Sequence, residues 1–235
     1  MAASQSIETV LNDEGNEPMQ SKGHVRARPS AWLKMNELND ANQEADRTMV
    51  SLVGHSQPEL RAATKRALRD EISFIGNSEF GNKDLGKKLF SHPLGLAPRQ
   101  AELGIAAIRR SGIDMPIHLG RLCEAPLLNP EQEKMLFQRM NYLLQQAEVH
   151  RSLLNPARPS RVRLELIQRL KSLAAWHRDR IVEANLRLVF SIVKKFVNPN
   201  NSFDDLLSDG IVALIRAVEK FDFDRGFRFS TCLLY

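Results

Sequence analysis

Residues 184–231 read ANLRLVFSIVKKFVNPNNSFDDLLSDGIVALIRAVEKFDFDRGFRFST, and this stretch decides the fold. Apolar residues recur at helical spacing over residues 181–196, and Lys194 and Lys195 lie in the last turns, where cations complement a helix dipole. The sequence NPNN at 198–201 predicts a turn. Ser202, followed by Asp204 and Asp205, then marks the start of a second amphipathic helix. The pattern predicts two packed helices and an all-α domain.

The second helix is expected to bury one apolar face and to leave an acidic face in water. The residues predicted to be buried are Leu206, Leu207, Ile211, Leu214, Ile215 and Val218. The outer face then carries Asp205, Ser208, Asp209, Arg216 and Glu219. Packing alone explains such stripes, since burial of an aliphatic or Phe side chain stabilises a fold by about 1.5–3 kcal/mol.

The segment FDFDRGFRFST at 221–231 interleaves aromatic and basic residues. Seven of the eleven Phe residues of the chain follow residue 180, so this concentration needs a physical reason. One reason is a tight core beneath a turn that ends at Gly226. The other is a platform on which unstacked bases rest, worth about 1–3 kcal/mol per base, with Arg225 and Arg228 neutralising phosphates. Composition leaves both interpretations open.

Composition limits the other classes of protein. The net charge is +5 and the pI is near 9.4, which permits a nucleic-acid partner without requiring one. Cys123 and Cys232 lie far apart and form no disulfide framework, which fits a reducing compartment. No apolar run is long enough for a membrane span, and the N-terminus lacks the pattern of a signal peptide. We therefore expect a cytoplasmic protein with no membrane partner.

No enzyme motif is found along the chain. The histidines lack metal-binding spacing, and neither a C-x-x-C pair nor a glycine-rich phosphate loop is present. The pair Asp204 and Asp205 is better explained as a helix start than as a metal site. We expect no catalytic residue, no metal and no cofactor.

The remainder of the chain is predicted to be helical or disordered. Residues 1–57 are polar and are expected to be mostly disordered, and 58–112 form a helical segment of unknown role. Residues 113–150 form a helical hairpin whose second helix starts at Asn129, with Pro130 in the first turn and Gln132 at the capping-box position. Residues 151–179 are expected to be a variable helical insert, which leaves 180–235 as the informative unit.

Two stretches resemble a known family. NLRLVFSIVKKF and DDLLSDGIVALIRAVEKFDFDRGFRFST resemble region 2 of the bacterial RNA polymerase sigma factors of the sigma-70 family. The hairpin PIHLGRLCEAPLLNPEQEKMLFQRM is similar to region 1.2, which precedes region 2 in housekeeping-type members. The resemblance implies a helical bundle and a factor that binds core RNA polymerase and directs it to promoter DNA.

In this family the second helix docks onto a coiled coil in the largest polymerase subunit. Carried over, the core-binding residues are Asp205, Leu206, Ser208, Asp209, Ile211 and Ile215. The family usually has Gln at the position of Ser208 and Asn at that of Ile211, which implies docking of altered strength.

The segment that follows opens the minus-ten element in this family and holds the melted strand. The DNA-binding residues implied by the resemblance are Lys194, Lys195, Arg225, Phe227, Arg228, Phe229 and Thr231. Unstacking a base costs a few kcal/mol, which explains why aromatic and basic groups are assembled together.

After Thr231 the sequence leaves the family pattern. The family continues with Tyr and a promoter-reading helix, whereas this sequence has Cys232, Leu233, Leu234 and Tyr235. We interpret region 2 as truncated here, by a frameshift, an early stop or a partial gene model. Two alternatives to an initiation factor stay open: a decoy or inactive fragment that occupies core polymerase, and a helical DNA-binding protein unrelated to polymerase.

Overall fold

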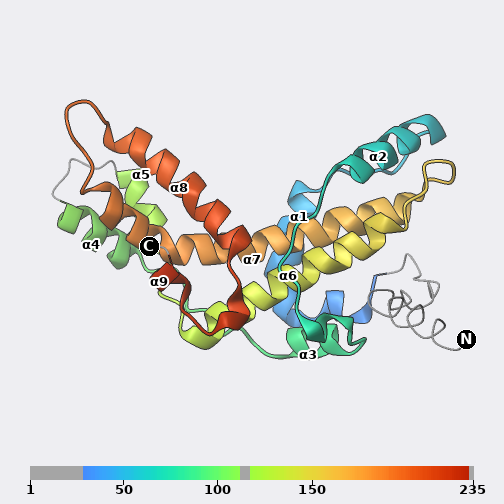
Figure 1. Ribbon diagram of the computed structural model, residues 1–235, viewed down its shortest axis with the longest axis horizontal. Coiled ribbons are helices and arrows are strands. Elements are labelled where there is room, and N and C mark those ends of the chain that lie inside the picture. The colour runs from blue at the N-terminus through green and yellow to red at the C-terminus, as the bar shows by residue number, and fades with distance from the viewer. Residues whose placement is uncertain (1–28, 112–116, 233–235) are drawn as a thin grey trace, which may run out of the picture.

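A computed structural model describes residues 29–111 and 117–232, and over these ranges the fold is all-α, with no strand. Its centre is a long pair of helices, α6 (Pro130–Ser152) and α7 (Arg161–Val193), which lie side by side (Figure 1). Helix α8 (Phe203–Lys220) packs against α7. In the described part of the chain no helix is long and apolar enough to cross a membrane.

Shorter elements surround this centre. They are η1 (Ala31–Lys34), η2 (Asn36–Leu38), α1 (Asn39–Thr48), α2 (Gln57–Arg69), η3 (Ser78–Gly81), α3 (Leu85–Ser91), α4 (Ala101–Ser111), α5 (Ile117–Gly120), η4 (Arg121–Cys123), η5 (Phe223–Arg225) and α9 (Phe229–Cys232).

The predicted start of α6 is confirmed. Asn129 is the N-cap, and its side chain accepts a hydrogen bond from the backbone N–H of Gln132 at 2.8 Å. The Gln132 side chain accepts from the Asn129 N–H at 3.0 Å, which completes the capping box, and Pro130 occupies the first turn. Gln132 also donates to the carbonyls of Leu94 and Gly95, so the cap holds the preceding segment against the helix.

Helix α7 is continuous where the sequence pattern suggested a boundary near residue 180. It runs for 33 residues without Gly or Pro. The apolar stripe passes through the suggested boundary because His177 is fully buried and Ile181 and Ala184 continue the same face. A buried histidine broke the apolar pattern in the sequence but fills a core position in the fold.

The N-terminal segment is ordered from residue 29 onward, in contrast to the expectation of disorder over 1–57; residues 1–28 lie outside the described part. Helix α1 buries Ala41 and Ala45, one turn apart, against α7. Small side chains allow this close approach although α1 is polar overall. Arg169 of α7 then donates hydrogen bonds to Asn42 at 2.9 Å and to Asp46 at 2.5 Å.

A buried arginine ties α3 to α6. The Nη2 atom of Arg139 donates to the carbonyl of Leu89 at 2.7 Å and also to that of His92, at the C-terminal end of α3. Its guanidinium lies 5.2 Å from the centre of the Phe90 ring. Burial lowers the pKa of Arg139 to about 10. Two backbone acceptors and an aromatic face therefore stabilise a cation that would otherwise be costly to bury.

Candidate functional site

Helix α8 begins where the sequence predicted. The Oγ atom of Ser202 accepts a hydrogen bond from the Asp205 N–H at 3.2 Å and lies 2.6 Å from the Asp205 carboxylate. The apolar face buries Leu207, Leu214 and Val218. Asp204 and Asp205 lie in the first turn, where carboxylates complement the helix dipole.

Gly210 sets how closely α8 approaches α7. A Cβ atom at this position would lie 2.8 Å from Cγ1 of Val189 and 3.3 Å from Cγ2 of Val193. These separations are shorter than van der Waals contact, so only glycine permits the observed approach. The position of the outer face of α8 therefore depends on one residue without a side chain.

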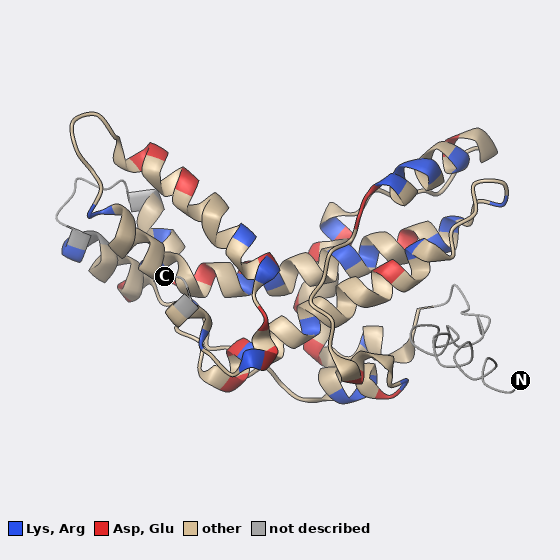
Figure 2. Ribbon diagram, viewed as in Figure 1, with Lys and Arg blue, Asp and Glu red and all other residues tan. Residues whose placement is uncertain are grey.

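The outer face of α8 is acidic and partly apolar. Asp205, Ser208 and Asp209 are exposed, and no ion pair reaches the two carboxylates from any residue in 29–111 or 117–232. Figure 2 shows the acidic positions along the upper side of this helix. Leu206, Ile211 and Ile215 are only partly buried and pack at the edge of the core. The six residues of the predicted docking set thus fall into two groups on α8. Asp205, Ser208 and Asp209 are exposed on the outer face, and Leu206, Ile211 and Ile215 lie at its edge.

Ser208 and Ile211, the two departures from the family pattern, both have local roles. The Ser208 hydroxyl donates to the carbonyl of Asp204, one turn back, at 2.9 Å. Ile211 packs against the hydrophobic core. Neither side chain therefore presents the amide group that the family usually has at these two positions.

The four phenylalanines of the segment 221–231 divide into core and surface. Phe221, Phe223 and Phe229 are buried, whereas the Phe227 side chain is 66% exposed. The Phe229 ring lies 5.4 Å from that of Phe137 and 5.2 Å from that of Phe221, in an aromatic cluster. The core interpretation therefore holds for three of the four residues, and Phe227 is the one whose ring is left exposed.

The loop between Phe223 and Phe229 turns at Gly226, whose φ of 77° is in the left-handed region that glycine adopts without strain. This turn places Phe227 outside. An open cleft of about 320 Å³ lies beside it, lined by Ala217, Lys220, Phe221, Asp222, Arg225, Phe227 and Phe229. The cleft combines aromatic walls with two basic residues.

Arg225 forms an ion pair with Asp222 at 2.9 Å and remains largely exposed. The hydrogen bond from Arg225, followed by that from the Asp224 N–H, lowers the pKa of Asp222. Asp222 is therefore charged near neutral pH and orients the guanidinium at the cleft.

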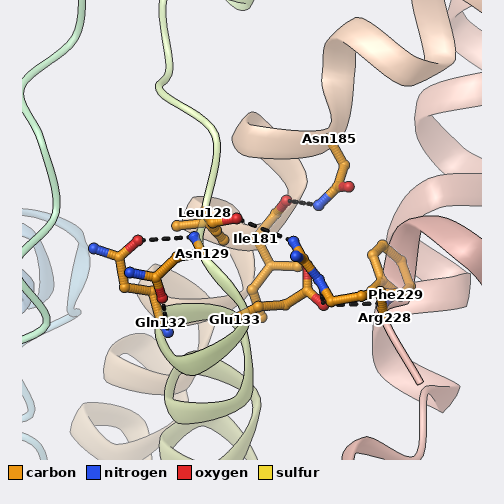
Figure 3. A network of polar contacts seen from close by, with 8 residues as sticks. All are labelled: Leu128, Asn129, Gln132, Glu133, Ile181, Asn185, Arg228 and Phe229. Atoms are coloured by element: carbon orange, nitrogen blue, oxygen red, sulfur yellow. Dashed lines mark hydrogen bonds and ion pairs between the residues drawn. The ribbon is translucent and has the colours of Figure 1, made fainter. Parts of the chain in front are cut away.

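Arg228 and Phe229 are anchored to α6 through Glu133 (Figure 3). Arg228 Nε lies 3.1 Å from one Glu133 oxygen and Nη2 lies 3.2 Å from the other, while Nη2 also donates to the Leu128 carbonyl at 3.0 Å. The Phe229 N–H donates to Glu133 at 2.9 Å. The structure thus places Phe229 within the core, and it places Arg228, whose side chain is 42% exposed, on a buried carboxylate of α6.

The N-terminal segment touches the same loop. Asn77 Nδ2 donates to the Asp224 carboxylate at 2.6 Å, across 147 residues of sequence. Next to it the Phe80 and Phe223 rings stack with centroids 6.5 Å apart. The sequence offered no signal for Asn77, Phe80 or Glu133 as parts of this site, because each resembles an ordinary turn, core or helix-start residue.

The remaining predicted residues lie at the surface. Lys194 and Lys195 are exposed at the C-terminal end of α7, and the Lys194 ammonium donates to the Arg110 carbonyl of α4 at 3.1 Å. Thr231 is exposed on α9. Among the described residues no cluster of His, Cys, Asp and Glu has the arrangement of a metal site.

Comparison with known proteins finds relatives of the segment that holds these residues. Residues 181–234 match the family model for sigma-70 region 2. The chain is 36% identical over 121 residues to the RNA polymerase sigma factor SigA of Clostridium acetobutylicum, a match that covers 51% of this chain and 24% of that protein. It is 37% identical over 127 residues to SigA1 of Synechococcus elongatus, covering 54% of this chain and 30% of the relative.

A shorter match, 54% identical over 54 residues, is to SigA of Nostoc sp. and covers 23% of this chain and 14% of the relative. The chain thus matches less than a third of the length of these relatives. No solved structure matches it. Residues 181–234 thus form a sigma-70 region 2, and over about half of its length the chain is similar to RNA polymerase sigma factors.

Proposed function

We propose that this chain is a transcription initiation factor that binds core RNA polymerase through α8 and directs it to promoter DNA, where the loop around Phe227 holds the melted strand. The observation that carries the proposal is the coexistence, in one region 2, of a free acidic helix face and an exposed aromatic residue beside a basic cleft. The relatives bear the name RNA polymerase sigma factor.

Docking rests on the charge of the α8 face. Asp205 and Asp209 lie one helical turn apart, and no cation among the described residues neutralises them. Complementary charge speeds the encounter of two proteins and fixes their register. The exposed Val212, between Asp209 and the C-terminal half of the helix, adds an apolar contact. The partner surface is proposed to be a basic, partly apolar coiled coil of the largest polymerase subunit.

Strand binding rests on Phe227. Phe227 presents an aromatic face to solvent, and an unstacked base offers a flat aromatic partner for it. Arg225 and Lys220 border the same cleft and supply positive charge for the phosphates. We place Lys195 and Thr231 at the margin of this DNA path, with Lys194 held against α4.

Arg228 and Phe229 are proposed to support this surface from beneath. Their contacts with Glu133, Phe137 and Phe221 fix the backbone on the C-terminal side of Phe227. A rigid support lowers the entropy that the loop loses on binding, so these residues contribute through pre-organisation.

The strand-binding part is tested with the full chain bound to core polymerase and a fluorescent single strand of minus-ten sequence. Loss of one stacked base, about 1–3 kcal/mol, predicts that Phe227→Ala weakens binding about 5- to 150-fold. Phe196→Ala is the matched control, because Phe196 is 60% exposed on a different element. Equal affinity of the Phe227→Ala variant and the unaltered chain would contradict this part of the proposal.

A further inference from the structure

Helix α2 carries a row of cations that the region 2 site does not use. Arg61, Lys65, Arg66 and Arg69 are all exposed, and the first, second and last are spaced four residues apart. With a rise of 1.5 Å per residue, the row spans about 12 Å on one side of the helix. Figure 2 shows these basic positions along α2.

No carboxylate neutralises this row. In 29–111 and 117–232 none of the four cations makes an ion pair, although nearby cations do: Arg169 pairs with Asp46, and Lys171 lies 3.9 Å from Asp70. Glu59, the one acidic residue of α2, instead accepts hydrogen bonds from the N–H and hydroxyl of Ser56 in a capping box. The single carboxylate of α2 is thus engaged in its cap, and the face from Arg61 to Arg69 carries charges of one sign.

The chemistry of this face fits phosphate better than a protein surface. Leu60, Ala63, Ala67 and Leu68, together with the polar Thr64, are turned toward the core, and the only apolar side chain among 60–69 that is exposed is the small Ala62. Protein interfaces have an apolar or aromatic centre and few lysines, and the outer face of α2 offers no such anchor. A row of arginine and lysine without acidic residues between them is instead typical of surfaces that bind a phosphate backbone.

The row lies at the other end of α6 from the strand-binding loop. Arg151, near the C-terminus of α6, donates to the Leu68 carbonyl of α2 at 2.9 Å, whereas Glu133, near its N-terminus, holds Arg228. Their separation of 18 positions corresponds to about 27 Å along the helix. That length equals the rise of about eight base pairs of B-form DNA. Figure 1 shows α2 and α9 toward opposite ends of the α6–α7 pair.

We propose that the α2 row, Arg61, Lys65, Arg66 and Arg69, binds the phosphate backbone of duplex DNA independently of base sequence. The site goes beyond the proposed function, because it is separate from the melted-strand surface and gives the segment before region 1.2 a role in holding double-stranded DNA. Each cation that contacts a phosphate releases condensed counterions, so the binding has a measurable salt signature.

The test measures binding of the full chain, without polymerase, to a fluorescent duplex of arbitrary sequence by anisotropy at several salt concentrations. The variant R61Q/K65Q/R66Q/R69Q keeps good helix formers on an exposed face, and its helicity is checked by circular dichroism. With about 0.9 counterions per contact, the slope of log K against log salt is expected to become shallower by up to about 3.6. The matched control K34Q/K83Q/K87Q/K88Q removes four exposed cations from η1, α3 and the preceding loop.

Three outcomes would overturn the proposal. The α2 variant could keep the slope of the unaltered chain, or the control could lose as much slope as the α2 variant. A variant that binds duplex normally but binds core polymerase more weakly would indicate an acidic protein partner for α2. Phe227→Ala is expected to leave the duplex slope unchanged, so failure of this site and failure of the strand-binding proposal are distinguishable.

Discussion

Glu133 and Arg228 are joined by two contacts of 3.1 and 3.2 Å across 95 residues of sequence, and this pair fixes the loop around Phe227 to α6. The Glu133 side chain is only 7% exposed, and its carboxylate also accepts the Phe229 N–H. A single carboxylate therefore binds the side chain of Arg228 and the backbone N–H of the next residue, Phe229.

Glu133→Ala is expected to destabilise the fold by about 1–3 kcal/mol, because it leaves the buried Phe229 N–H without an acceptor. Glu133→Gln retains an amide oxygen for that N–H and should cost less. Urea unfolding of both variants measures the difference. Glu131→Ala, an exposed change in the same turn, is the control, and equal losses in the Ala and Gln variants at 133 would contradict the account.

Asn77 is expected to hold the loop from the N-terminal side. Asn77→Asp places a second carboxylate against Asp224, and the repulsion should weaken single-strand binding a few-fold. The exchange variant N77D/D224N restores one carboxylate and one amide, and should recover the affinity. Binding of the minus-ten strand by the polymerase complex measures both, and failure of the exchange to recover affinity would argue against this contact.

Gly210→Ala is expected to force α8 away from α7. The added Cβ would meet Val189, and such overpacking costs about 1–3 kcal/mol, partly offset by about 1 kcal/mol of gained helix propensity. The double variant G210A/V189A removes the clash, so its loss should be smaller than the sum of the single losses. Thermal unfolding tests this non-additivity, and strictly additive losses would show that the two residues do not meet.

The buried His177 is expected to lower the free energy of unfolding in mild acid. Burial lowers its pKa to about 3, with Arg139 adding to the shift, and its Nδ1 lies 2.8 Å from the Leu173 carbonyl. The unfolded chain binds a proton near pH 6.5, where histidine ordinarily titrates, but the folded chain does not. The free energy of unfolding therefore falls by about 1.4 kcal/mol per pH unit as the pH drops below about 6.

His177→Phe should flatten this dependence between about pH 6 and pH 4, whereas the exposed His55→Gln change should not alter it. Urea unfolding at each pH measures the effect. A pH dependence that is the same in the His177→Phe variant and in the unaltered chain would exclude His177 as its source.

The parts of the fold with local causes could be predicted from the sequence. Asn129 with Gln132, and Ser202 with its aspartates, mark helix starts because a cap is a contact within three residues. The acidic face of α8 also follows from its periodicity. These features need no knowledge of the rest of the chain.

The parts with distant causes could not be predicted. Arg139 binds carbonyls about fifty residues away, and the polar helix α1 is held by the fit of Ala41 and Ala45 against α7 and by the hydrogen bonds of Arg169. The sequence does not distinguish the four phenylalanines of the loop, yet Phe229 is buried and Phe227 is exposed. The difference depends on Glu133 of α6, which accepts a hydrogen bond from the Phe229 N–H and so holds the backbone after Phe227 against the helix.

Docking through α8 is measured by the affinity of the full chain for bacterial core RNA polymerase. The charge reversal D205K/D209K is compared with E79K/D84K, which reverses two exposed carboxylates of the N-terminal segment. We expect tight binding by the unaltered chain and by the control, and a loss of at least about tenfold, or about 1.4 kcal/mol, in D205K/D209K. Absence of binding by the unaltered chain, or equal binding by D205K/D209K, would contradict docking through α8.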